Sequence, residues 1–200
     1  MSEERDAPRR ICVFCGSSPG GQLAYQQAAL DLGTALHRRG YGLVYGGGQI
    51  GLMGAIARRV LDLGGKVTGI IPRTLTEREV AFEDVDELIV VTSMHERKAL
   101  MSKRSGGFIA LPGGFGTLEE LFEVITWAQL GIHSKPFGIL NVGGFYDSLL
   151  AFLDHAVSEG FIRPVYREMI VVSKDPDELL DMMEAWTPPE PIDWLDLQDS

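Results

Sequence analysis

Short apolar segments alternate with longer amphipathic segments along most of the chain. The apolar segments predict strands at residues 11–15, 41–45, 66–71, 88–91, 108–111, 137–140 and 169–172. Between them, apolar residues recur three or four positions apart and predict helices at residues 24–36, 52–63, 93–104, 117–130, 146–159 and 176–185. Asp175 and Pro176 supply an N-cap and a first-turn proline for the last helix. Residues 73–86 are polar and irregular and predict a loop.

This alternation predicts an α/β fold, a Rossmann-like doubly wound parallel sheet in a single domain. The strands are apolar almost throughout, as expected where helices cover both faces of a sheet. We expect residues 1–186 to form this domain. Residues 187–200 contain three prolines, four acids and no base, and we expect a flexible acidic tail.

The net charge of −10 argues against a nucleic-acid polymer as partner, because phosphate binding needs a basic face. Positive charge is nevertheless concentrated at Arg97, Lys98, Lys103 and Arg104. The first residues lack the apolar core of a signal peptide, and no apolar run approaches the ~20 residues of a membrane span. We therefore expect a cytoplasmic protein with no membrane partner.

The cysteines and histidines predict no metal site. Cys12 and Cys15 have the spacing of a redox pair or half a zinc site, but they lie in a predicted strand and no second Cys or Cys/His pair accompanies them. We expect both to be small buried residues. The four histidines are scattered without metal-ligand spacing.

Three glycine-rich turns, at residues 16–21, 46–54 and 112–117, each follow a predicted strand. The carboxyl ends of parallel strands share one edge of the sheet, where ligands bind, so backbone amides should converge there on an anion. The turn at 46–54 has the G-x-G-x-x-G spacing of dinucleotide sites but lacks the acid expected about 20 residues later. For that turn, a tight strand-to-helix connection is an equal alternative.

The turn at 112–117 opens the sequence Pro-Gly-Gly-Phe-Gly-Thr-Leu-Glu-Glu. A helix that begins here would present free N–H groups to a phosphate. Thr117 would cap this helix or donate to a phosphate oxygen. Glu119 and Glu120 should fall in its first turn, either to complement the helix dipole or to place a carboxylate beside a sugar.

Arg97 and Lys98 follow the fourth predicted strand, at the same edge of the sheet. Arg97 offers a planar fork for phosphate or carboxylate, and Lys98 a compact charge. A solvated helix face is the alternative for this pair, and His95 beside it is expected to be structural.

Arg97 and Lys98, followed by residues 112–120, resemble the paired signature P-G-G-x-G-T-x-x-E of the LONELY GUY family. Residues 46–48 with 51–54, and residues 126–131, are also similar to that family. The resemblance extends from about Ile11 to Val172, and Phe115 stands at the variable position of the signature.

The resemblance implies hydrolysis of N6-modified adenosine 5′-monophosphates to a free base and ribose 5-phosphate. It implies a catalytic pair, Arg97 and Glu120, and a homodimer with its sites near the subunit interface. The residues that it implies contact the nucleotide are Glu79, Lys98, Gly114, Phe115, Gly116, Thr117, Leu118, Glu119 and Thr126. The glycine turns add Gly16, Ser17, Gly47 and Gly113, and we expect Met94 with Phe115 to line an apolar pocket for an N6 group.

In this mechanism Glu120 stabilises the positive charge that develops on the ribose, or orients water. Arg97 supports the phosphate or the leaving base, and no metal or organic cofactor is required. Relatives of the family have also been labelled lysine decarboxylases, a chemistry that would need pyridoxal phosphate on a lysine. The second hypothesis is a non-catalytic nucleotide or cofactor carrier. The sequence leaves the preferred base open.

Overall fold

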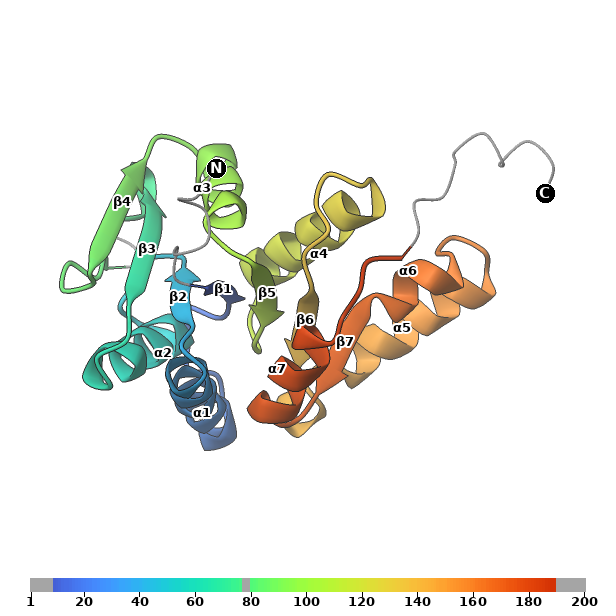
Figure 1. Cartoon of the computed structure of the whole chain (residues 1–200), viewed down its shortest axis with the longest axis horizontal. Coiled ribbons are helices and arrows are strands. Elements are labelled where there is room, and N and C mark those ends of the chain that lie inside the picture. The colour runs from blue at the N-terminus through green and yellow to red at the C-terminus, as the bar shows by residue number, and fades with distance from the viewer. Residues whose placement is uncertain (1–8, 77–79, 190–200) are drawn as a thin grey trace.

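A computed structural model describes residues 9–76 and 80–189, and within them the chain forms one seven-stranded sheet (Figure 1). Every neighbouring pair of strands is parallel. The order is β4-β3-β2-β1-β5-β6-β7. The strands are β1 (Arg10–Phe14), β2 (Gly42–Tyr45), β3 (Val67–Pro72), β4 (Glu87–Val91), β5 (Gly107–Ala110), β6 (Phe137–Leu140) and β7 (Ile170–Ser173). The predicted doubly wound α/β class is confirmed.

Helices cover both faces of the sheet and bury a core on each (Figure 1). One face carries α1 (Leu23–Arg38), α2 (Gly51–Asp62) and α7 (Pro176–Glu184). The other carries α3 (Met94–Lys103), α4 (Phe115–Gln129), α5 (Asp147–Ser158) and α6 (Pro164–Glu168). Two 3-10 turns, η1 (Arg73–Leu75) and η2 (Val142–Gly144), lie in connections. Within the described ranges, no helix combines the length and the apolarity that a bilayer crossing needs.

Most predicted elements lie within one or two residues of their predicted positions, and Asp175 caps α7 as expected by accepting from the amides of Asp177 and Glu178. One element was missed, the short helix α6, in a stretch read as a connection. In α3, Ser93 is the N-cap, Met94 is exposed in the first turn, and Met101 is buried.

The order of the strands positions a ligand site between β1 and β5. The chain builds the sheet from β1 through β4 in one direction, and then crosses to build β5 through β7 in the other. At such a switch point the connections leave the sheet on opposite faces, and a crevice forms at the carboxyl ends of the strands. Backbone hydrogen bonds join the turns there: Gly16 N donates to Pro112 O (3.1 Å), and Leu52 N donates to Gly16 O (3.0 Å).

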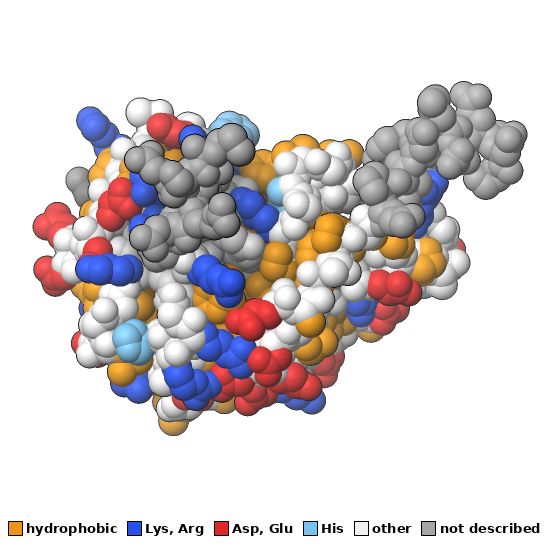
Figure 2. All heavy atoms as spheres, viewed as in Figure 1, with side chains coloured by type: hydrophobic (Ala, Val, Ile, Leu, Met, Phe, Trp, Pro, Cys, Tyr) orange, Lys and Arg blue, Asp and Glu red, His pale blue; other side chains and the backbone are white. Residues whose placement is uncertain are grey.

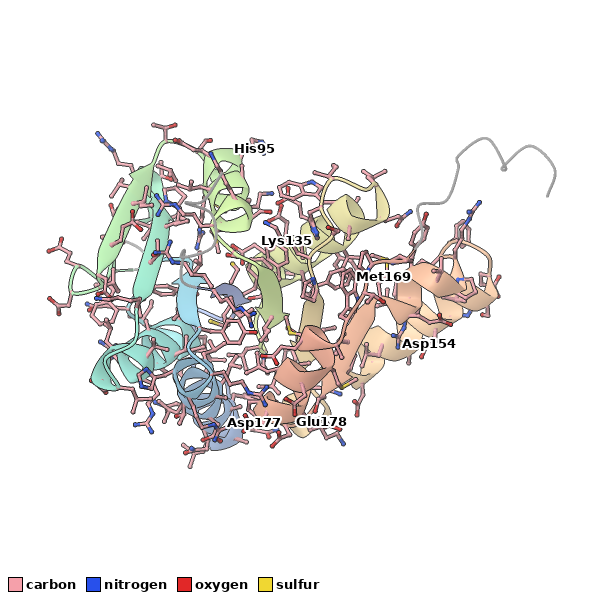
Figure 3. The ribbon with its side chains drawn as sticks, viewed as in Figure 1. His95, Lys135, Asp154, Met169, Asp177 and Glu178 are labelled. Atoms are coloured by element: carbon pink, nitrogen blue, oxygen red, sulfur yellow. The ribbon has the colours of Figure 1, made fainter. Side chains whose placement is uncertain are left out.

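Far from this crevice, α1 and α7 are joined by ion pairs. Arg39 pairs with Asp181 (Nη1–Oδ1, 2.6 Å) and Arg38 with Asp177, which Figure 3 labels beside α1. Figure 2 shows the corresponding mixture of basic and acidic side chains along the lower edge of the molecule. Each pair has at least one well-exposed partner, so water screens the interaction and it adds little to stability.

Candidate active site

A cavity of about 340 Å³ opens at the carboxyl ends of β1, β2 and β5. It brings together residues from the three connections that follow these strands and from the first turn of α3. The sequence-predicted residues that line it are Gly16, Ser17, Met94, Arg97, Gly114, Phe115, Gly116, Thr117 and Glu120. Both members of the expected catalytic pair therefore line one cavity.

Arg97 reaches this cavity from α3 and is only 4% exposed. Its Nη2 donates to the carbonyl oxygen of Gly46 at 3.0 Å, and its Nη1 lies 3.8 Å from the sulfur of Met94. The carbonyl at the end of β2 thus fixes a buried guanidinium. This hydrogen bond requires glycine at residue 46, because a Cβ there would lie 2.0 Å from Nη2 of Arg97.

Glu120 reaches the cavity from α4 and is 9% exposed. Burial raises the pKa of the Cys12 thiol, and the nearby Glu120 carboxylate raises it further, whereas the Arg97 guanidinium lowers it. Glu120 and Arg97 therefore both lie close enough to Cys12 for their charges to affect the thiol. The expectation that Glu119 and Glu120 lie in the first helical turn was wrong, because α4 begins earlier than predicted, at Phe115.

The N-terminus of α4 faces open space. Its N-cap is Gly114, with extended backbone (φ −95°, ψ −155°) and no side-chain cap. Of the two roles expected for Thr117, the cap is therefore wrong; Thr117 is a buried residue of the first turn that lines the cavity, and its donation to a phosphate oxygen stays a prediction. A Cβ at Gly114 or Gly116 would meet no atom within 4 Å. The first-turn amides and the positive end of the helix dipole thus point toward a volume that can hold an anion.

The loop before this helix is packed tightly. A Cβ at Gly113 would lie 2.1 Å from Thr117 Oγ1 and 2.9 Å from Gly16 N. Gly113 therefore allows the loops after β1 and β5 to approach one another, and it does not itself line the cavity. Gly47 is also outside the lining; it has a left-handed backbone (φ +80°) and packs against Ile71.

Several residues expected to contact a nucleotide lie elsewhere. Lys98 is absent from the cavity lining, since its ammonium binds Glu119 and, at 2.9 Å, Glu123. Leu118 is half-buried on α4, and Thr126 is exposed and donates to a backbone carbonyl of its own helix. Glu79 lies outside the described residues.

The cavity also has lining residues that were not predicted as site residues: Val13, Cys15, Gly46, Met53 and Leu75. Gly46 and Met53 belong to the glycine turn at 46–54, and the other three lie near the carboxyl ends of β1 and β3. Cys12 and Cys15 are both buried and neither forms a disulfide, which confirms the prediction of small buried residues.

The histidines take no part in this cavity. His95 lies exposed on α3, where Figure 3 labels it at the outer edge of the molecule, and it does not line the cavity. Among residues 9–76 and 80–189, no group of three or more His, Cys, Asp or Glu side chains is arranged to hold a metal ion.

Comparison with known proteins places this site in context. Residues 53–183 match the family model described as "Possible lysine decarboxylase". The cytokinin riboside 5′-monophosphate phosphoribohydrolase LOG3 of Arabidopsis thaliana is 58% identical over 187 residues, which cover 94% of this chain and 87% of that protein. The phosphoribohydrolase LOG1 of the same plant is 57% identical over 180 residues, covering 90% and 84%.

Solved structures with the same fold are more distant in sequence. The molybdenum cofactor binding protein of Rippkaea orientalis has a TM-score of 0.67 at 21% identity, covering 89% of this chain and 96% of that one. The Moco carrier protein of Chlamydomonas reinhardtii has a TM-score of 0.66 at 18% identity, with the same coverage. At these identities the likeness establishes the fold alone.

Proposed function

Because this chain belongs to the LONELY GUY family, we propose that it hydrolyses the N-glycosidic bond of N6-modified adenosine 5′-monophosphates. The products are the free base, a cytokinin, and ribose 5-phosphate. The names of relatives that are 53–58% identical supply the substrate class. The observation that carries the proposal is the cavity in which Arg97 and Glu120 face the open N-terminus of α4.

We place the 5′-phosphate at the N-terminus of α4. The amides of residues 114–117 and the helix dipole favour a dianion there, and Gly114 and Gly116 leave space for it. Gly16 and Ser17 form the opposite wall of the same volume. A phosphate held by fixed amides orients the attached ribose and lowers the entropic cost of reaching the transition state.

The anomeric carbon then lies toward Glu120. Cleavage builds positive charge on the ribose ring, and a largely buried carboxylate stabilises that charge or orients the attacking water. A guanidinium is not a general acid, so Arg97 acts by donating hydrogen bonds and by its charge. Its position beside Gly46 directs it to the phosphate or to the departing base.

The base occupies the apolar part of the cavity. Met53, Leu75, Met94 and Phe115 line it, and the last two are exposed at the mouth. An apolar N6 substituent would cover such side chains and release ordered water from them. We therefore expect an N6-prenylated nucleotide to bind more tightly than AMP.

The description of the family model raises a second chemistry, lysine decarboxylation with pyridoxal phosphate. A Schiff-base lysine must supply a neutral amine. Lys98 is the neighbour of Arg97 in sequence. Burial lowers the pKa of Lys98, but the hydrogen bonds and charges of Glu119 and Glu123 together raise it more, so that the pKa lies above its ordinary value. Its ammonium is thus stabilised as a cation, which is unfavourable for that role.

We also propose that the chain acts as a homodimer in the cytoplasm. Phe115, Leu130 and Ile132, at the two ends of α4, are 93%, 51% and 64% exposed. Exposed large apolar side chains at both ends of this helix favour contact with another protein surface. Light scattering on the purified protein tests this, and a monomeric mass would contradict it.

Product chromatography tests the proposed function. The pure protein is incubated with AMP and with isopentenyladenosine 5′-monophosphate, beside the two nucleosides without phosphate. We expect free base from the monophosphates alone, and faster release from the isopentenyl compound. No free base from any of the four, despite measurable nucleotide binding, would instead favour a carrier.

Replacement of Glu120 by Gln separates catalysis from binding. The amide keeps the size of the side chain and removes the charge that stabilises the ribosyl cation. We expect Glu120→Gln to lose turnover while it binds AMP nearly as the wild type does. Retained turnover would show that another group performs this role.

A further inference from the structure

Beside the cavity, a buried ion pair joins α3 to α4. Lys98 on α3 is 9% exposed, and its Nζ donates to carboxylates of Glu119 and of Glu123 on α4, the latter at 2.9 Å. The Glu123 side chain is 22% exposed and that of Glu119 is 53% exposed. Because water screens an exposed pair, the Lys98–Glu123 contact is the better shielded of the two.

This ion pair is adjacent to the proposed catalytic residues. Lys98 follows Arg97 on α3, and Glu119 precedes Glu120 on α4. Lys98, Glu120 and Glu123 border a small void of about 10 Å³. Glu120 therefore borders both this void and the substrate cavity. Neither Lys98 nor Glu123 lines the substrate cavity.

We infer that Lys98 and Glu123 are positioning residues, which fix α3 against α4 so that Arg97 and Glu120 meet across the substrate cavity. The inference rests on the proposed function and assigns these two side chains no contact with the nucleotide. Two helices that carry one catalytic group each need a fixed separation, because a displacement of about 1 Å can slow a reaction roughly 100-fold. A buried pair with directed hydrogen bonds supplies that constraint.

The geometry favours this role over phosphate binding by Lys98. An ammonium has three N–H donors, and two of them are directed at carboxylates of α4. The raised pKa of Lys98 agrees with a permanent cation held by these carboxylates. A phosphate would have to compete with two negative groups for the same charge.

The test compares Lys98→Met, Glu123→Gln and the double variant with the wild type, using isopentenyladenosine 5′-monophosphate. We expect kcat to fall roughly 10- to 100-fold in each single variant, with KM almost unchanged. The double variant should lose no more than Lys98→Met does, because both changes break one interaction. Lys103→Met, at an exposed lysine of the same helix, is the matched control and should keep the wild-type kcat.

Thermal unfolding of each variant identifies any loss of fold, and Glu123→Gln is the milder change because Lys98 retains Glu119. A raised KM with unchanged kcat in Lys98→Met would make Lys98 a substrate contact and overturn the inference. Wild-type kcat in Glu123→Gln, or additive losses in the double variant, would also overturn it. A wild type that releases no free base would overturn the proposed function, and the inference with it.

Discussion

Gly46 offers a test of how strictly Arg97 must be placed. An alanine Cβ at this position would lie 2.0 Å from Nη2 of Arg97 and 3.1 Å from the sulfur of Met53. The backbone of Gly46 is not in the left-handed region, so alanine brings no conformational strain of its own. The substitution therefore acts through the space that it takes from the guanidinium.

The size of the effect follows from that distance. Side-chain contacts to Cβ atoms essentially never fall below 3.0 Å, so Nη2 must retreat by about 1 Å (3.0 minus 2.0) and loses its 3.0 Å hydrogen bond to Gly46 O. We expect kcat to fall roughly 100-fold, because a 1 Å misplacement of a reacting group has about that effect. Loss of a hydrogen bond to a buried charge should lower the free energy of unfolding by about 1.5–3 kcal/mol.

Steady-state kinetics on the isopentenyl nucleotide and urea unfolding measure the two effects of Gly46→Ala. Gly21→Ala is the control, since a Cβ there meets nothing within 4 Å and should change neither quantity. In an Arg97→Ala background, Gly46→Ala should have no further effect on kcat. Wild-type kcat in Gly46→Ala would refute the argument that the contact with residue 46 places Arg97.

Three further predictions concern the phosphate site and the frame around it. Gly116→Ala should fold with an unchanged melting temperature, because a Cβ there meets open space, but it should raise KM by occupying the proposed phosphate volume; an unchanged KM would move the phosphate elsewhere. Tyr146→Phe removes the 2.7 Å hydrogen bond from Tyr146 Oη to Leu111 O and should lower the free energy of urea unfolding by about 1–3 kcal/mol; an unchanged value would mean that this bond contributes nothing net. Burial lowers the pKa of His133 in the folded protein from its ordinary value of 6.5. The stability that depends on the neutral ring is therefore fully present above pH 6.5, the pKa in the unfolded chain, and is lost as the pH falls through the pKa of the folded protein. The melting temperature should therefore decrease less between about pH 7.5 and about pH 5.5 in His133→Gln than in the wild type, and equal decreases would contradict this reasoning.

The sequence predicted the elements of this fold well because its local patterns and its tertiary packing agree. The strands are apolar on both faces, and glycines end several helices, so that each boundary has a local cause. The three glycine turns could be placed at one edge of the sheet by topology alone. Their position around a common cavity agrees with that argument.

The remaining features depend on distances that no local pattern contains. The start of α4 was misplaced because Gly114, without a side-chain cap, begins the helix where Thr117 looked like the better cap. The family resemblance implies that Lys98 contacts the nucleotide, and that stays a prediction; in the structure Lys98 does not line the cavity, because successive helical residues point in different directions. Its partner Glu123 lies 25 positions away, and only the packing of α3 on α4 brings them together.

The hydrogen bonds that join Gly16 to Pro112 and Leu52 to Gly16 are made entirely by the main chain. These bonds join the loops at the carboxyl ends of the central strands, whereas Met94 and Phe115, which also line the cavity, present exposed side chains. With the base placed as proposed, substitutions of Met94 or Phe115 change which base is accepted without breaking these main-chain bonds. Relatives that share this backbone framework can then differ in base preference through a few substitutions.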